Sequence, residues 1–98
     1  MISPRTTVTK VEPLAKRWVR LTFGDGAVHE VDLTGLLAAG GAFATIRDER
    51  EVFEAVTVDQ EFGTIAWPGD IDLDPDVLRG DQIPTSGRPL PRRVIQPA

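Results

Sequence analysis

The chain has 98 residues, room for one small domain, with 41% apolar and 27% charged residues, the balance of a folded globular protein. It contains no cysteine, which excludes disulfides, thiolate metal sites and a cysteine nucleophile, and is typical of a reducing compartment. Residues 1–78 carry 7 basic and 14 acidic side chains, an acidic body that disfavours direct nucleic-acid binding, whereas residues 79–98 carry 4 arginines and 1 aspartate.

The beginning of the chain contains no targeting signal that we recognise. Its first five residues lack the apolar stretch of a signal peptide, and no apolar run in the sequence approaches the roughly 20 residues of a membrane span. We therefore expect a soluble, cytoplasmic protein without membrane contact.

A strand followed by a hairpin is predicted near the start of the chain. Residues 6–12 alternate β-branched and polar side chains up to Pro13, which predicts the first strand. Residues 17–23 predict a strand with two distinct faces, Val19, Leu21 and Phe23 on one and Trp18, Arg20 and Thr22 on the other. Gly24-Asp25-Gly26 tolerates positive φ, so residues 27–33 are expected to complete an antiparallel hairpin.

The middle of the chain predicts short helices and a second hairpin. Residues 34–37 indicate a helical turn and residues 38–42 a flexible loop. Asp48 and Glu51 have the spacing of a capping box, which predicts a helix that runs to Val56. Two further strands flank a turn, at residues 56–59 and 64–67.

These elements predict an α+β fold, with a small, mostly antiparallel sheet built from two β-hairpins and one or two short helices on one face. We expect one contiguous core, formed by Val19, Leu21, Phe23, Val31, Phe53, Ile65 and Trp67.

Four aspartates alternate along the next segment, Asp70, Asp72, Asp74 and Asp76, with Asp81 at the twelfth position from Asp70. This spacing is similar to a calcium-binding loop, but Pro75 stands where such a loop needs glycine. We therefore favour an edge strand that leads into a helix, with Asp74 as N-cap, Pro75 as first helical residue and Gly80 near the end. A small-molecule- or metal-binding site at Asp70–Asp76 is kept as the alternative function.

The composition changes after Gly80, so we expect a single domain over residues 1–80 and a disordered tail, residues 81–98. Four prolines and the absence of an apolar period indicate that the tail is dispensable for folding. Its basic charge allows it to dock on the acidic body, to bind another chain or to remain solvated.

The order of these elements resembles the small bacterial family catalogued as domain of unknown function 2442, over about residues 7–78. The similar segments are Val19–Gly26, Val31–Leu33, the helix around Phe53 and, most specifically, Ile65–Leu78 with its Trp67-Pro68 and Asp72-Leu73-Asp74-Pro75. The chain departs from the family at Leu78-Arg79, where such domains carry Leu-Tyr. The resemblance implies a compact α+β fold without an assigned activity. Relatives fused to helix-turn-helix modules, or located beside toxin-like partners, imply a regulatory or antitoxin-like binding role.

The residues themselves favour a non-catalytic protein-interaction module, with no cofactor and no metal. His29 is the single histidine, and nothing in the sequence supplies a triad around it, so we expect it on the surface. Trp18, flanked by Arg17 and Arg20, is the candidate interaction surface for a protein partner or a second copy of the chain. Packing of Trp18 under the first strand or under the tail is the alternative.

Overall fold

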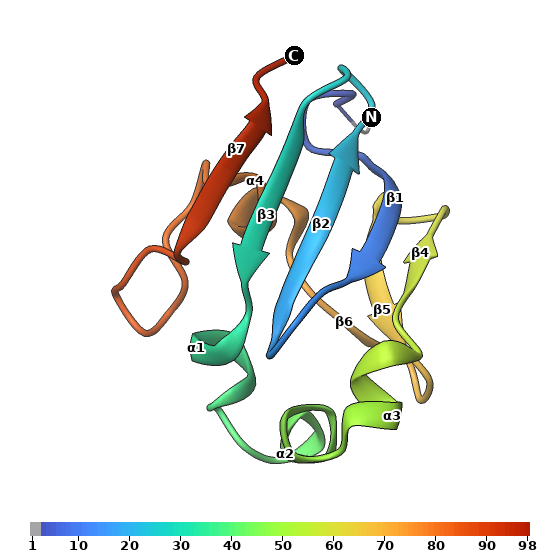
Figure 1. Cartoon of the computed structure of the whole chain (residues 1–98), viewed down its shortest axis with the longest axis vertical. Helices are drawn as coiled ribbons and strands as arrows, with labels where there is room; N and C mark the ends of the chain where they lie inside the picture. Colours follow the sequence, from blue (N-terminus) through green and yellow to red (C-terminus); the bar gives the residue numbers. More distant parts are fainter. Residues whose placement is uncertain (1–2) are drawn as a thin grey trace.

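The computed structural model describes residues 3–98, which form two antiparallel sheets and four short helices (Figure 1). The first sheet has the order β1-β2-β3-β7, with β1 at Val8–Pro13, β2 at Trp18–Phe23, β3 at Val28–Asp32 and β7 at Arg92–Gln96. The second has the order β4-β5-β6, with β4 at Thr57–Asp59, β5 at Thr64–Trp67 and β6 at Ile71–Asp72. The helices are α1 at Thr34–Leu37, α2 at Ala42–Asp48, α3 at Arg50–Glu54 and α4 at Pro75–Arg79. The predicted α+β class and both hairpins are confirmed.

The core lies between the two sheets and is closed by the helices (Figure 1). Every second side chain of β2 is buried, as the alternation of the sequence predicts. The seven predicted core residues are all buried in one cluster. The second sheet lies beside β1, where the amide of Val8 donates to the carbonyl of Gly63 at 2.8 Å.

The helices between the sheets begin and end differently from the prediction. Residues 42–48 form α2 because Phe43 and Ile46, three positions apart, share a face, and Ile46 is fully buried. Asp48 therefore ends α2, where it pairs with Arg47, and it does not cap the next helix. The predicted capping box is wrong, since Glu49 is the N-cap of α3 and accepts no bond through its side chain.

α4 follows the prediction closely. The side chain of Asp74 accepts a hydrogen bond from the amide of Asp76 at 2.9 Å, and Pro75 is the first helical residue. Gly80 ends the helix with a left-handed φ of 94°. In the region that the structure describes, no helix is long and apolar enough to cross a membrane.

The structure places the tail, residues 81–98, against the body, where its composition predicts disorder. Its residues 92–96 form β7 along β3, and Leu90 is buried in the core. The tail lacks a regular apolar period because its contacts are made by single residues at irregular positions. The position of the tail therefore depends on a few anchoring side chains.

Candidate interaction surface

The outer face of the first sheet carries a row of alternating charges. Glu12, Arg20, Glu30 and Arg93 lie opposite one another on β1, β2, β3 and β7. Arg20 is 2.8 Å from a carboxylate oxygen of Glu12 and 2.9 Å from one of Glu30, and Arg93 is 3.3 Å from Glu30. Arg20 thus contacts both acidic neighbours across the sheet.

Trp18 lies on this face next to the charged row and is half-buried. The guanidinium of Arg93 stacks on its ring, 4.2 Å from the centroid. Arg17 is placed elsewhere, with its Nε donating to the carbonyl of Arg47 and its guanidinium 5.1 Å from the ring of Phe53. The structure therefore brings Trp18 and Arg20 together on one face, separates Arg17 from them, and covers Trp18 with the tail.

A second arginine of the tail, Arg92, reaches into the body behind β3. Its Nη1 donates to Nδ1 of His29 at 2.9 Å and to the carbonyls of Leu78 and Arg79 at 3.0 Å each. Its Nη2 is 3.4 Å from the carbonyl of Val77. We call this set of acceptors, His29 Nδ1 and the three carbonyls at the end of α4, the Arg92 site.

His29 is buried, with 6% of its surface exposed, which corrects the prediction of a surface histidine. It shares the inner face of β3 with Val31 and meets the ring of Phe23 edge-on at 5.3 Å. Because arginine only donates hydrogen bonds and carries a positive charge, its place 2.9 Å from Nδ1 favours the neutral form of the ring. Burial first, and then the charges of Arg92 and Arg79, lower the pKa of His29.

This geometry predicts that the protein loses stability in mild acid. The pKa of His29 is lower in the folded chain than the ordinary value of about 6.5, so the unfolded chain binds more protons below that pH. Stability is fully present above about pH 6.5 and falls as the pH drops toward the lowered pKa. Urea unfolding at pH 7.5 and 5.5 measures this loss, and His29→Gln, which keeps a polar group beside Arg92, should reduce it. An equal loss in His29→Gln contradicts the assignment. Arg5 and Asp25 also face this site and are unchanged in the variant.

Arg79 completes the buried polar cluster. Its guanidinium lies 4.8 Å from the ring centroid of Phe23, pairs with Asp25 at 3.1 Å, and donates to the carbonyl of Arg5. Its position is not among the predictions, and the one sign of it in the sequence is Leu78-Arg79, where the resemblance implies Leu-Tyr.

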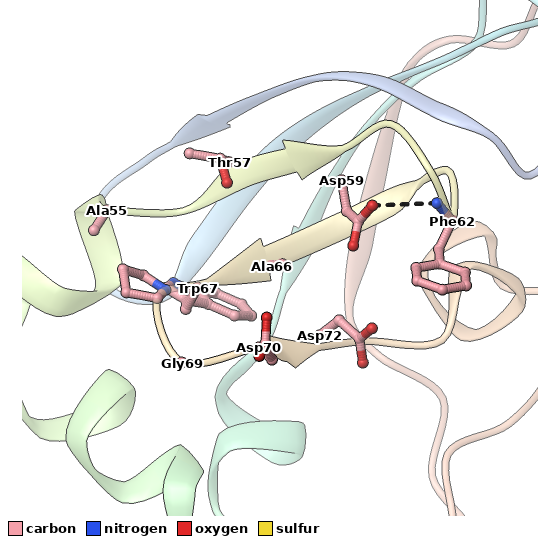
Figure 2. A pocket seen from close by; sticks show the side chains of 10 residues that line it. Ala55, Thr57, Asp59, Phe62, Ala66, Trp67, Gly69, Asp70 and Asp72 are labelled. Atoms are coloured by element: carbon pink, nitrogen blue, oxygen red, sulfur yellow. Dashed lines mark hydrogen bonds between the residues drawn. The ribbon is translucent and has the colours of Figure 1, made fainter.

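The alternating acids do not gather as a set. Asp70 and Asp72 border a hollow of about 460 Å³ on the second sheet, together with Asp59 (Figure 2). The exposed ring of Phe62 closes one end, and Asp59 accepts a hydrogen bond from the amide of Phe62 at 3.2 Å. Within residues 3–98, no three acidic, histidine or cysteine side chains lie close enough together to hold a metal ion. Asp72 lies on the two-residue edge strand β6, in keeping with the predicted edge strand.

We expect these acids to differ in their effects on stability. Asp74→Ala removes the α4 cap and should lower the free energy of unfolding by about 0.5–2 kcal/mol, with or without calcium. Asp72→Ala, an exposed control, should change it by less than about 0.5 kcal/mol. Thermal melts across a calcium titration check both values. If calcium raised the melting midpoint of the wild-type chain saturably but not that of Asp72→Ala, this would establish a metal site instead.

Comparison with known proteins gives one match. The model of a family described as "Protein of unknown function (DUF2442)" matches residues 8–83. No curated protein and no solved structure matches the chain. The matched range contains both hairpins and α4, and ends before β7.

Proposed function

The chain belongs to the DUF2442 family, which has no assigned function. From its exposed edge strand β7 we propose that it is a non-catalytic protein-interaction module of a regulatory, antitoxin-like kind. The observation that carries the proposal is the exposed edge formed by β7. β7 is the last strand of its sheet, and Val94 and Ile95 on it are 54% and 53% exposed.

Edge strands offer unpaired backbone groups to other chains, and proteins usually protect them with charges, prolines or covering loops. Both arginines of β7 are already occupied, Arg92 by the Arg92 site and Arg93 by Glu30 and Trp18. Val94 and Ile95 on this strand remain exposed. Successive side chains of a strand point to opposite faces, so a partner strand that pairs with β7 would contact one of them on each face, a recurring mode of recognition.

Quantitative affinity capture from the host tests the proposal. Three full-length baits are compared: the wild-type chain, Val94→Asp/Ile95→Asp, and Phe62→Asp. Phe62 is a matched control because it is 58% exposed and lies on the other sheet's turn. We expect partners that bind the wild-type and Phe62→Asp baits and fall at least tenfold on the β7 variant. Equal capture by all three folded baits contradicts an interaction through β7.

A further inference from the structure

The Arg92 site has the form of a receptor for one guanidinium. The carbonyls of Val77, Leu78 and Arg79 lie at the end of α4, where the last carbonyls have no amide four residues ahead in the helix. That of Val77 also accepts from the amide of Gly80 at 3.1 Å. One arginine contacts all three and the ring of His29. A planar guanidinium carries five donors and suits such a set, whereas a lysine offers a single charged group.

Gly80 keeps this space open. A Cβ atom at this position would lie 2.9 Å from Cζ of Arg92, closer than real Cβ contacts. The left-handed φ of 94° also favours glycine. The body of the protein, outside the tail, therefore contains a glycine that both ends α4 and leaves room for an arginine side chain.

Further contacts extend the site along β3. The amide of Asp32 donates to the carbonyl of Pro91 at 2.9 Å, and the strand pairs follow from there. Leu90 is 6% exposed, and Arg93 meets Glu30 and Trp18. The edge of β3 thus holds an extended segment through a leucine, two arginines and backbone hydrogen bonds.

The connection between the body and this segment is exposed over most of its length, and its first residue is held by an ion pair between Asp81 and Arg5 at 2.7 Å. In residues 81–89 only Pro84 is buried. Fully extended, this connection would reach roughly 30 Å, compared with 24 Å for the shortest dimension of the protein. The body is acidic and the tail basic, so the tail of one copy is attracted to the body of another.

We infer that the edge of β3 and the Arg92 site bind residues 88–98 of a second copy in place of the chain's own tail. The exchanged tail makes the same contacts as the resident one, which is why exchange of an identical element is a low-cost route to a dimer. This inference goes beyond the proposed function, because it concerns the edge of β3 and leaves the outer edge of β7 open to another chain. The result is a reciprocal dimer in which each copy supplies β7 to the other.

Disulfide trapping in full-length chains tests the exchange, since the sequence contains no cysteine. Val28 and Gln96 are register partners on β3 and β7, and neither belongs to the anchoring contacts. A Val28→Cys chain is mixed with a tagged Gln96→Cys chain under mild oxidation, and the mixed disulfide is quantified on a non-reducing gel. Val28→Cys mixed with Phe62→Cys measures random collision between exposed cysteines.

We expect at least tenfold more mixed disulfide in the first mixture, and a fall to the collision level when Arg92→Ala is added to the Gln96→Cys chain. A yield at the collision level, or one that Arg92→Ala leaves unchanged, overturns the inference. Val28→Cys/Gln96→Cys in one chain should close internally, and failure to do so also overturns it, because the register is then wrong. Failure of the exchange with continued β7-dependent capture of another protein removes the exchanged dimer and leaves the proposed function standing.

Discussion

Phe53→Ala is expected to lower the free energy of unfolding by about 3–5 kcal/mol. Phe53 is the buried side chain of α3, with no exposed surface. The guanidinium groups of Arg17 and Arg50 lie 5.1 and 5.0 Å from its ring centroid, so the truncation also removes two cation–π contacts. A short helix of five residues has little stability of its own and depends on this anchor.

Urea unfolding followed by circular dichroism gives the measurement. Glu51→Ala is the matched control, since Glu51 is exposed on the same helix and its loss should cost less than about 0.5 kcal/mol. A Phe53→Ala chain within about 1 kcal/mol of the wild-type would show that α3 is not held through this ring.

Trp67→Ala should also lower the free energy of unfolding by about 3–5 kcal/mol. Trp67 is 2% exposed, and its Nε1–H donates to the carbonyl of Phe53 at 3.0 Å, which ties β5 to α3. Trp67→Phe keeps an aromatic ring but loses this hydrogen bond, at a cost of about 0.5–1.5 kcal/mol, because the amide of Val56 still donates to the carbonyl of Phe53 at 3.3 Å. The same unfolding measurement separates the two variants. Equal costs for Trp67→Ala and Trp67→Phe would mean that the ring itself contributes no packing.

The hairpins and the core could be predicted because alternation and turn residues are local signals. Val19, Leu21 and Phe23 alternate with polar residues before Gly24-Asp25-Gly26, and the structure places them as this pattern indicates. Asp74 and Pro75 are likewise local signals, since each residue type is favoured at the position it takes at the start of α4. The capping box at Asp48 failed because the same local spacing can occur at the end of one helix as well as at the start of the next.

The polar contacts of the candidate surface could not be predicted, because they join distant parts of the chain. The order of the tail depends on Arg92 meeting His29 and α4, contacts between residues 13 or more positions apart. Sequence periodicity does not predict such long-range contacts. For His29, the alternation with Val31 on the inner face of β3 was a local signal of burial that the surface prediction overlooked, and only its partner Arg92 lay beyond such signals. The alternation of β2 places Trp18 and Arg20 on one face, as the structure does, but it does not predict that the guanidinium of Arg93 stacks on the ring of Trp18.

The central claim is that β7 is a displaceable strand, held at the edge of β3 by a few anchors. Residues 93–96 are all exposed, and holding each residue of the tail in place costs about 1–2 kcal/mol of conformational entropy. β2 lies in the middle of the sheet and buries every second side chain, so its amides should exchange only through larger openings.

Native-state hydrogen exchange followed by NMR tests this claim most directly. We predict that the ladder-bonded amides of β7 exchange at least a hundredfold faster than those of β2. Arg92→Lys, which contacts the Arg92 site through one charged group only, should accelerate β7 further and leave β2 unchanged. Exchange of β7 and β2 at the same rate, with Arg92→Lys accelerating both together, would show that the tail opens only when the whole domain unfolds and would contradict the account.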